Sequence, residues 1–96
     1  MSSDEYLVEV YAPRAGAAAV REAAIRACAA ADALSREGTA VRYVRAIFVP
    51  EDKTCFHVFE AVSQEAVRTV SERAAFPAQR IVRAIGVQPT ATESGA

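Results

Sequence analysis

Apolar and polar residues alternate in four short segments of the chain and recur at helical spacing in two longer ones. Alternation in steps of two is typical of a β-strand with one buried face, whereas apolar residues three or four positions apart indicate an amphipathic helix. Residue preferences agree, because the short segments are rich in β-branched and aromatic residues and the first long one in alanine. The predicted elements are strand 6–11, helix 17–37, strand 41–49, strand 55–61, helix 64–76 and strand 80–87.

Turn and capping residues separate these elements. Gly38 follows the first helix, at the position where a left-handed residue commonly ends a helix. Residues 50–53 form a polar turn that joins the two central strands into an antiparallel hairpin. Ser63 is a suitable N-cap for the second helix. Pro77 ends that helix, because the residue before a proline avoids helical backbone angles.

The order β-α-β-β-α-β predicts an α+β fold of the ferredoxin-like type, a four-stranded antiparallel sheet with two helices on one face. The length of 96 residues suits a single domain, which we place at 1–88. Residues 89–96 are small and polar, and we expect them to form a flexible C-terminal tail.

Composition narrows the function classes. Eleven basic and twelve acidic residues give a net charge of −1, which excludes a nucleic-acid binder that works by bulk positive charge. The sequence has no long apolar run and no basic leader, so we expect a cytoplasmic protein without a membrane partner. Alanine accounts for 22 residues, so the core has few large side chains, and burial against a second copy is a natural supplement.

The hairpin turn predicts the register of the sheet. If Val49 faces Thr54, then Phe48 lies opposite Cys55, Ala46 opposite His57, and Val44 opposite Phe59. The face that packs against the helices then carries Val8, Val10, Val44, Ala46, Phe48, Cys55, His57, Phe59, Val82 and Ala84. The opposite face carries Leu7, Glu9, Tyr11, Tyr43, Arg45, Ile47, Val49, Phe56, Val58, Glu60, Ile81, Arg83 and Ile85. A slip of one residue in either strand would exchange its two sets.

The second face combines large apolar residues with polar ones, which is unusual for a solvated surface. We therefore expect a homodimer that packs sheet against sheet, with polar groups paired at the rim or lining a cavity. Arginines of this face have the geometry to bind a carboxylate or phosphate, and its tyrosines to orient a carbonyl. Pairing of arginine with glutamate across neighbouring strands is the structural alternative. The candidate ligand-binding residues are Glu9, Tyr11, Tyr43, Arg45, Glu60 and Arg83.

Cys55 and His57 lie two positions apart on one strand, so their side chains point to the same side and can share a metal ion. The more ordinary interpretation is a small buried cysteine and a hydrogen-bonded core histidine. The same pair is also the chain's candidate for nucleophilic catalysis, which would need the imidazole to accept the thiol proton.

Three segments resemble a known family. They are VRYVRAIFVPEDKTCFHVFEA at 41–61, SQEAVR at 63–68 and AFPAQRI at 75–81. They are similar to small actinobacterial proteins called nickel-binding-like, whose ferredoxin-like fold pairs into a dimeric α/β barrel. Where metal-binding relatives have an aromatic-Cys-aliphatic-aromatic motif, this chain has Phe56-His57-Val58-Phe59, with Cys55 displaced upstream. The resemblance implies a homodimer and nickel as the metal, with Cys55 and His57 as its ligands.

These observations favour a small dimeric protein that binds a ligand or a metal ion without catalysis. The alternative is a cofactor-independent dimeric α/β-barrel enzyme, of the monooxygenase or isomerase type, acting on a small organic substrate.

Overall fold

Four strands and two helices follow one another in the predicted order in the computed structural model, which describes residues 3–14, 16–87 and 89. A short 3₁₀ helix, Pro50–Asp52, forms the predicted hairpin turn. The elements are β1 (Asp4–Tyr11), α1 (Ala17–Arg36), β2 (Val41–Val49), β3 (Thr54–Ala61), α2 (Gln64–Arg73) and β4 (Ala78–Ala84).

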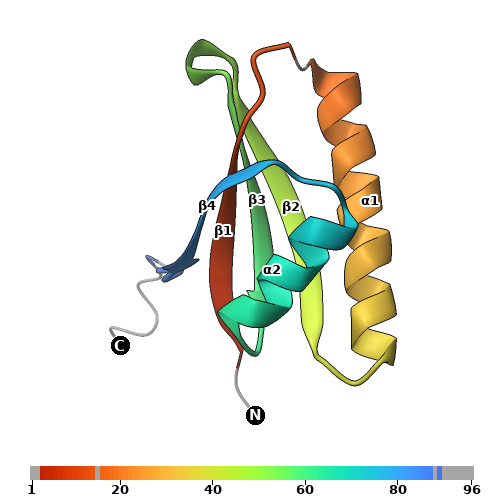
Figure 1. The fold of residues 1–96 in the computed structure, drawn as a ribbon. Helices are drawn as coiled ribbons and strands as arrows, with labels where there is room; N and C mark the ends of the chain where they lie inside the picture. Colours follow the sequence, from red (N-terminus) through yellow and green to blue (C-terminus); the bar gives the residue numbers. More distant parts are fainter. Residues whose placement is uncertain (1–2, 15, 88, 90–96) are drawn as a thin grey trace.

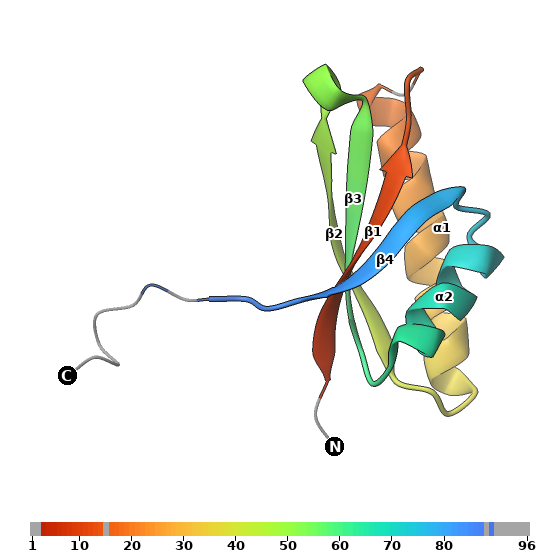
Figure 2. The same ribbon diagram turned by 60° about the vertical axis from the view of Figure 1, so that its left-hand side comes forward.

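The strands form one antiparallel sheet in the order β2-β3-β1-β4, with β3 and β1 in the centre. Both helices cover the same face of this sheet, and in the described part of the chain no helix lies over the opposite face, called the open face below (Figures 1 and 2). This arrangement confirms the predicted ferredoxin-like α+β fold.

The core lies between the sheet and the two helices. Helix α1 contributes mainly alanines, whose small side chains allow its backbone to approach the sheet closely, and α2 contributes valines. Phe59 on β3 is the largest fully buried side chain. The buried apolar residues of this core cluster are Tyr6, Val8, Val10, Ala27, Ala30, Ala31, Leu34, Val41, Phe59, Ala61, Ala66, Val67, Val70 and Ala74.

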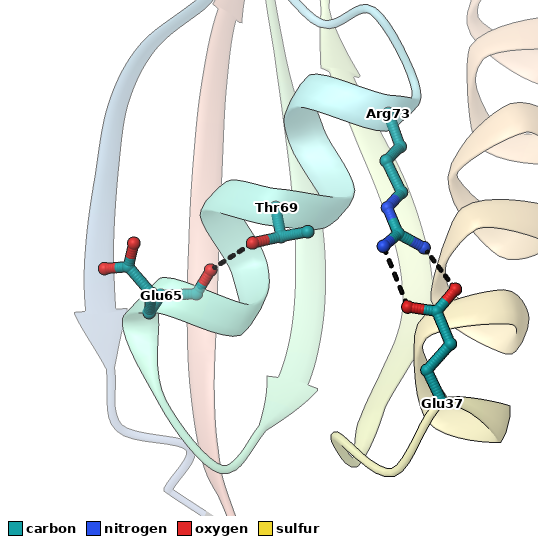
Figure 3. Close-up of polar contacts among 4 residues, drawn as sticks. All are labelled: Glu37, Glu65, Thr69 and Arg73. Atoms are coloured by element: carbon teal, nitrogen blue, oxygen red, sulfur yellow. Dashed lines mark hydrogen bonds and ion pairs between the residues drawn. The ribbon is translucent and has the colours of Figure 1, made fainter.

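Polar contacts fix the ends of α2. Ser63 Oγ accepts a hydrogen bond from the backbone N–H of Ala66 at 3.1 Å, which confirms the predicted N-cap. At the other end, Arg73 donates two hydrogen bonds of 2.9 Å to the carboxylate of Glu37, just after α1 (Figure 3). This fork joins the two helices on the surface and lowers the pKa of the Glu37 carboxyl, chiefly through its hydrogen bonds.

A β-bulge in β2 changes the predicted register. The pairs Phe48–Cys55 and Ala46–His57 are as predicted, but Tyr43 lies opposite Phe59, and the pairing shifts between Tyr43 and Arg45. The predicted placement of Tyr43 on the open face was therefore wrong. The extra residue at the bulge reverses the alternation, so Tyr43 lies on the helix side of the sheet and packs against the core.

The phase of β4 also differs from the prediction. Ile81 lies opposite Val8 and Arg83 opposite Tyr6, so both side chains are on the helix side rather than on the open face. Ile81 packs against the core accordingly. The alternation within β4 is real, but only its pairing with β1 decides which of the two sets faces the helices.

In the part of the chain that the structure describes, no helix is long and apolar enough to cross a membrane. Apart from Pro89, the predicted tail at 89–96 lies outside the described residues.

Candidate functional site

Strand β3 carries Cys55 and His57 under the helices, where both side chains are almost fully buried, at 3% and 2% exposure. They point to the same side because they are two positions apart on one strand. Their burial agrees with the interpretation of the pair as core residues. However, both side chains also line a pocket, so burial does not separate them from a space that a ligand could occupy.

A chain of polar contacts runs through His57. Its Nδ1 hydrogen-bonds the hydroxyl of Tyr43 at 2.8 Å, and its Nε2 lies 3.5 Å from Cys55 Sγ. Phe76, in the loop after α2, stacks on the imidazole with ring centroids 4.1 Å apart and planes 22° apart. Both ring nitrogens therefore have a partner, and either neutral tautomer can be accommodated by reversing the direction of the two hydrogen bonds.

The pocket beside these polar contacts has a volume of about 200 Å³. It lies between the end of β1, the first half of α1 and the loop from α2 to β4. Besides Cys55 and His57, its lining includes the polar residues Tyr11 and Arg26, and Arg26 Nε donates a hydrogen bond of 3.0 Å to the carbonyl of Ala74. The lining residues are Val10, Tyr11, Ala12, Ala19, Val20, Ala23, Arg26, Cys55, His57, Phe76 and Pro77.

Burial keeps the three polar side chains uncharged at neutral pH. It lowers the pKa of His57 to about 4, with a smaller contribution from the nearby positive charge of Arg26. It raises the pKa of the Cys55 thiol and that of the Tyr43 hydroxyl. A cysteine nucleophile needs a lowered pKa, so the protein environment does not activate Cys55 in this way.

The pair has the spacing of two ligands of one metal ion. Bond lengths of about 2.3 Å to sulfur and about 2.0 Å to nitrogen in a tetrahedral site place these two donors about 3.5 Å apart. Cys55 Sγ and His57 Nε2 are separated by 3.5 Å. Among the described residues there is no group of three or more His, Cys, Asp or Glu side chains that would complete such a site. The residues thus fit part of a coordination shell.

The six predicted ligand-binding residues are not brought together. Glu9, Arg45 and Glu60 lie on the open face, by their pairing with Phe56, Val58 and Arg42. Tyr11, at the end of β1, is 53% exposed. Tyr43 and Arg83 are on the helix side, and of the six only Tyr43 contacts His57, although Tyr11 borders the pocket.

Cross-strand ion pairs occupy several of these charges. Glu60 pairs with Arg42 at 2.9 Å rather than with Arg45. Longer contacts of 3.7 Å join Arg80 to Glu9 and Arg83 to Asp4. All these groups are partly exposed, so solvent weakens the pairs, but their arrangement matches the structural alternative of arginine–carboxylate pairing.

Sequence reasoning did not identify Phe76 and Arg26 as site residues. Phe76 falls at the predicted end of the second helix, and Arg26 lies inside the predicted helix 17–37, where nothing in the local pattern sets it apart. The one available signal was the large aromatic residue directly before Pro77, in a loop where small polar residues are more usual.

Comparisons with known proteins place this fold and its hairpin in a family. The chain matches the family described as Nickel responsive protein SCO4226-like over residues 6–83. Its fold is similar to the crystal structure of SCO4226 from Streptomyces coelicolor A3(2), with a TM-score of 0.69 and 20% identity over 88% of this chain and 99% of that one. No curated protein matches the chain. Since the family match spans most of the sequence and agrees with the resemblance of the hairpin, the chain belongs to the nickel-responsive SCO4226-like family.

Proposed function

We propose that this protein binds a divalent transition-metal ion through Cys55 Sγ and His57 Nε2, and that nickel is the ion to test first. The observation that carries the proposal is the 3.5 Å separation of these two atoms at the wall of a pocket. Thiolate and imidazole are donors that suit ions of this class. The family's name, nickel responsive, points to the same metal.

The surroundings of the pair define what each residue does on binding. His57 is already neutral at neutral pH and offers Nε2 when its proton is on Nδ1, directed at the Tyr43 oxygen. Cys55 is a thiol and releases its proton when it binds as a thiolate. Uptake is therefore coupled to the loss of about one proton per ion, and affinity rises with pH above neutrality.

Metal titration with a matched cysteine control tests this proposal. Native mass spectrometry and absorption spectra with Ni²⁺ should give one ion per chain and a thiolate-to-nickel charge-transfer band. Cys55→Ser and His57→Gln should lose the band and bind at least about tenfold more weakly. Cys28→Ser, which removes the exposed thiol of α1, should bind like the wild type. No uptake by the folded wild type, or an unchanged band in Cys55→Ser, would overturn the proposal.

We further propose that the functional unit is a homodimer in which two open faces cover one another. Support comes from the partly exposed apolar residues of this face, among them Leu7, Ile47 and Phe56, which solvent alone covers in a monomer. Residues 85–87, directly after β4, extend away from the body of the molecule (Figure 2), and Ile85 and Val87 are each 78% exposed. A second copy would bury both features.

This dimer would also give the predicted ligand-binding residues of the open face a common environment. Glu9, Tyr11, Arg45 and Glu60 would lie between the two sheets, either as pairs at the rim or as the lining of a shared cavity.

A further inference from the structure

The pocket beside His57 has an exposed rim and a buried floor. Among its lining residues Tyr11, Ala19 and Pro77 are exposed, whereas Cys55 and His57 are almost fully buried. The other apolar lining residues are Val10, Ala12, Val20, Ala23 and Phe76. Mostly apolar walls with a few polar groups are typical of a site for a small organic molecule.

Small side chains of α1 leave this space. The helix contributes Ala19 and Ala23 to the wall, where a longer aliphatic side chain would fill the pocket. The wall also includes Phe76, from the loop after α2. The hydrogen bond of 3.0 Å from Arg26 Nε to the carbonyl of Ala74 joins α1 to the end of α2. The pocket is thus formed before any ligand binds, which reduces the entropic cost of binding.

The imidazole of His57 is a hydrogen-bonding group at the floor. Its Nδ1 is bound to the hydroxyl of Tyr43, which is not among the lining residues, while its Nε2 contacts Cys55, which is. The partner of Nε2 is a sulfur atom at 3.5 Å, and a thiol is a weak donor and a weak acceptor. A ligand hydroxyl both donates and accepts, so it satisfies Nε2 better than the thiol does in either tautomer of the ring.

Charge disfavours ionic ligands at this floor. No aspartate or glutamate is among the described residues that line the pocket, and the charged residue of the lining is Arg26, so a cation finds no partner there. An anion would give up its hydration to reach His57, which is buried among mostly apolar residues. A neutral ligand avoids both costs.

The volume of about 200 Å³ limits the size of the ligand. An apolar cavity of about 150 Å³ is sufficient for benzene, whereas pockets for drug-sized ligands begin at about 300 Å³. One benzene-sized ring with a single small substituent therefore fits. A planar ring also suits contact with Phe76, because aromatic pairs are favourable beyond the area that they bury.

We infer that this pocket binds a small neutral aromatic alcohol of the size of phenol, with its ring among the apolar walls and its hydroxyl bound to His57. This inference goes beyond the proposed metal function and does not depend on it. The probe that tests it is phenol itself, titrated into the isotope-labelled full chain in a buffer with EDTA, which removes metal ions. Amide NMR spectra follow the titration.

For the wild type we expect saturable shifts of the amides around the pocket, with a Kd of about 1 mM. Three analogues of phenol separate the contributions to binding. Toluene lacks the hydroxyl, cyclohexanol lacks the aromatic ring, and benzoate carries a charge. Each should bind at least about threefold more weakly than phenol.

Variants of α1 assign binding to this pocket. Ala23→Leu fills the space and should weaken phenol binding at least about tenfold. Ala29→Leu makes the same change at an exposed position of the same helix outside the pocket and should match the wild type. The amide spectra also show whether each variant is folded, and the analogue series tests the inference on the wild type alone.

A double variant tests the role of the imidazole. His57→Phe with Tyr43→Phe keeps a ring against Phe76 and removes both partners of the buried hydrogen bond, so neither is left unpaired. This protein should bind phenol and toluene equally.

The outcomes are distinct from those of the metal titration. The inference is overturned by the absence of saturable shifts in the wild type, by binding that persists in folded Ala23→Leu, or by an analogue that binds as tightly as phenol. None of these results bears on nickel uptake, and a failure of nickel uptake leaves this inference unchanged.

Discussion

His57 is the only histidine of the chain and the residue on which the candidate site is centred. Because burial lowers its pKa from 6.5 to about 4, the unfolded chain binds a proton in a range where the folded chain does not. Between these two values the free energy of unfolding must fall as pH falls, and above pH 6.5 this group has no effect.

We therefore expect wild-type stability in urea unfolding to drop by about 2 kcal/mol from about pH 7 to about pH 5 because of His57. His57→Gln cannot take up the proton, so its stability should change much less over this range. Equal slopes for the two proteins would show that His57 titrates normally in the folded state.

Tyr43 offers a second test at the scale of single residues. Tyr43→Phe keeps the ring that packs edge-on against Phe59 at 5.2 Å but removes the hydroxyl bound to His57 Nδ1. A buried nitrogen then lacks its partner, so the free energy of unfolding should fall by about 1–3 kcal/mol. Tyr11→Phe is the control, because Tyr11 is exposed and its change should be close to zero. A stable Tyr43→Phe protein would contradict the buried hydrogen bond.

At the scale of elements, α2 decides where Phe76 lies. The helix begins at its Ser63 cap and ends in a turn where Ala75 has a positive φ of 60° and the Phe76 N–H bonds the carbonyl of Ser71 at 2.9 Å. This turn directs the chain back toward the sheet, where Phe76 covers the imidazole of His57.

Loss of the Ser63 cap should destabilise this element measurably. Ser63→Ala leaves the Ala66 N–H without its side-chain acceptor, and we expect a loss of about 1 kcal/mol in urea unfolding. Ser63→Asp restores an acceptor and places a negative charge at the helix N-terminus, so it should match the wild type or exceed it. If Ser63→Asp is as unstable as Ser63→Ala, the cap is not the cause.

At the scale of the whole molecule, the proposed dimer predicts that the open face is where association occurs. Light scattering of the purified 10.2 kDa chain should give twice that mass. Ile47→Glu places a charge on the open face and should produce monomers, since it would bury an unpaired carboxylate in the interface. Ile25→Glu changes an isoleucine that is 61% exposed on α1 and should remain dimeric. A monomeric wild type at micromolar concentration would contradict the proposal.

The sequence by itself was sufficient for the element order, the fold and the shared side of Cys55 and His57. Periodicity and capping are local properties, and two residues at an i, i+2 spacing on a strand point the same way in any fold. The hairpin turn also determined the pairs nearest to it, Phe48–Cys55 and Ala46–His57.

Only the tertiary structure decided which side Tyr43 and Ile81 occupy, and with them the composition of the site. The bulge between Tyr43 and Arg45 inserts one residue without any break in the sequence pattern, and one residue is enough to reverse the face of everything beyond it. Arg26 and Phe76 reach the pocket because two helices, distant in sequence, pack on the same face of the sheet. Such contacts depend on packing between elements, which local periodicity does not encode.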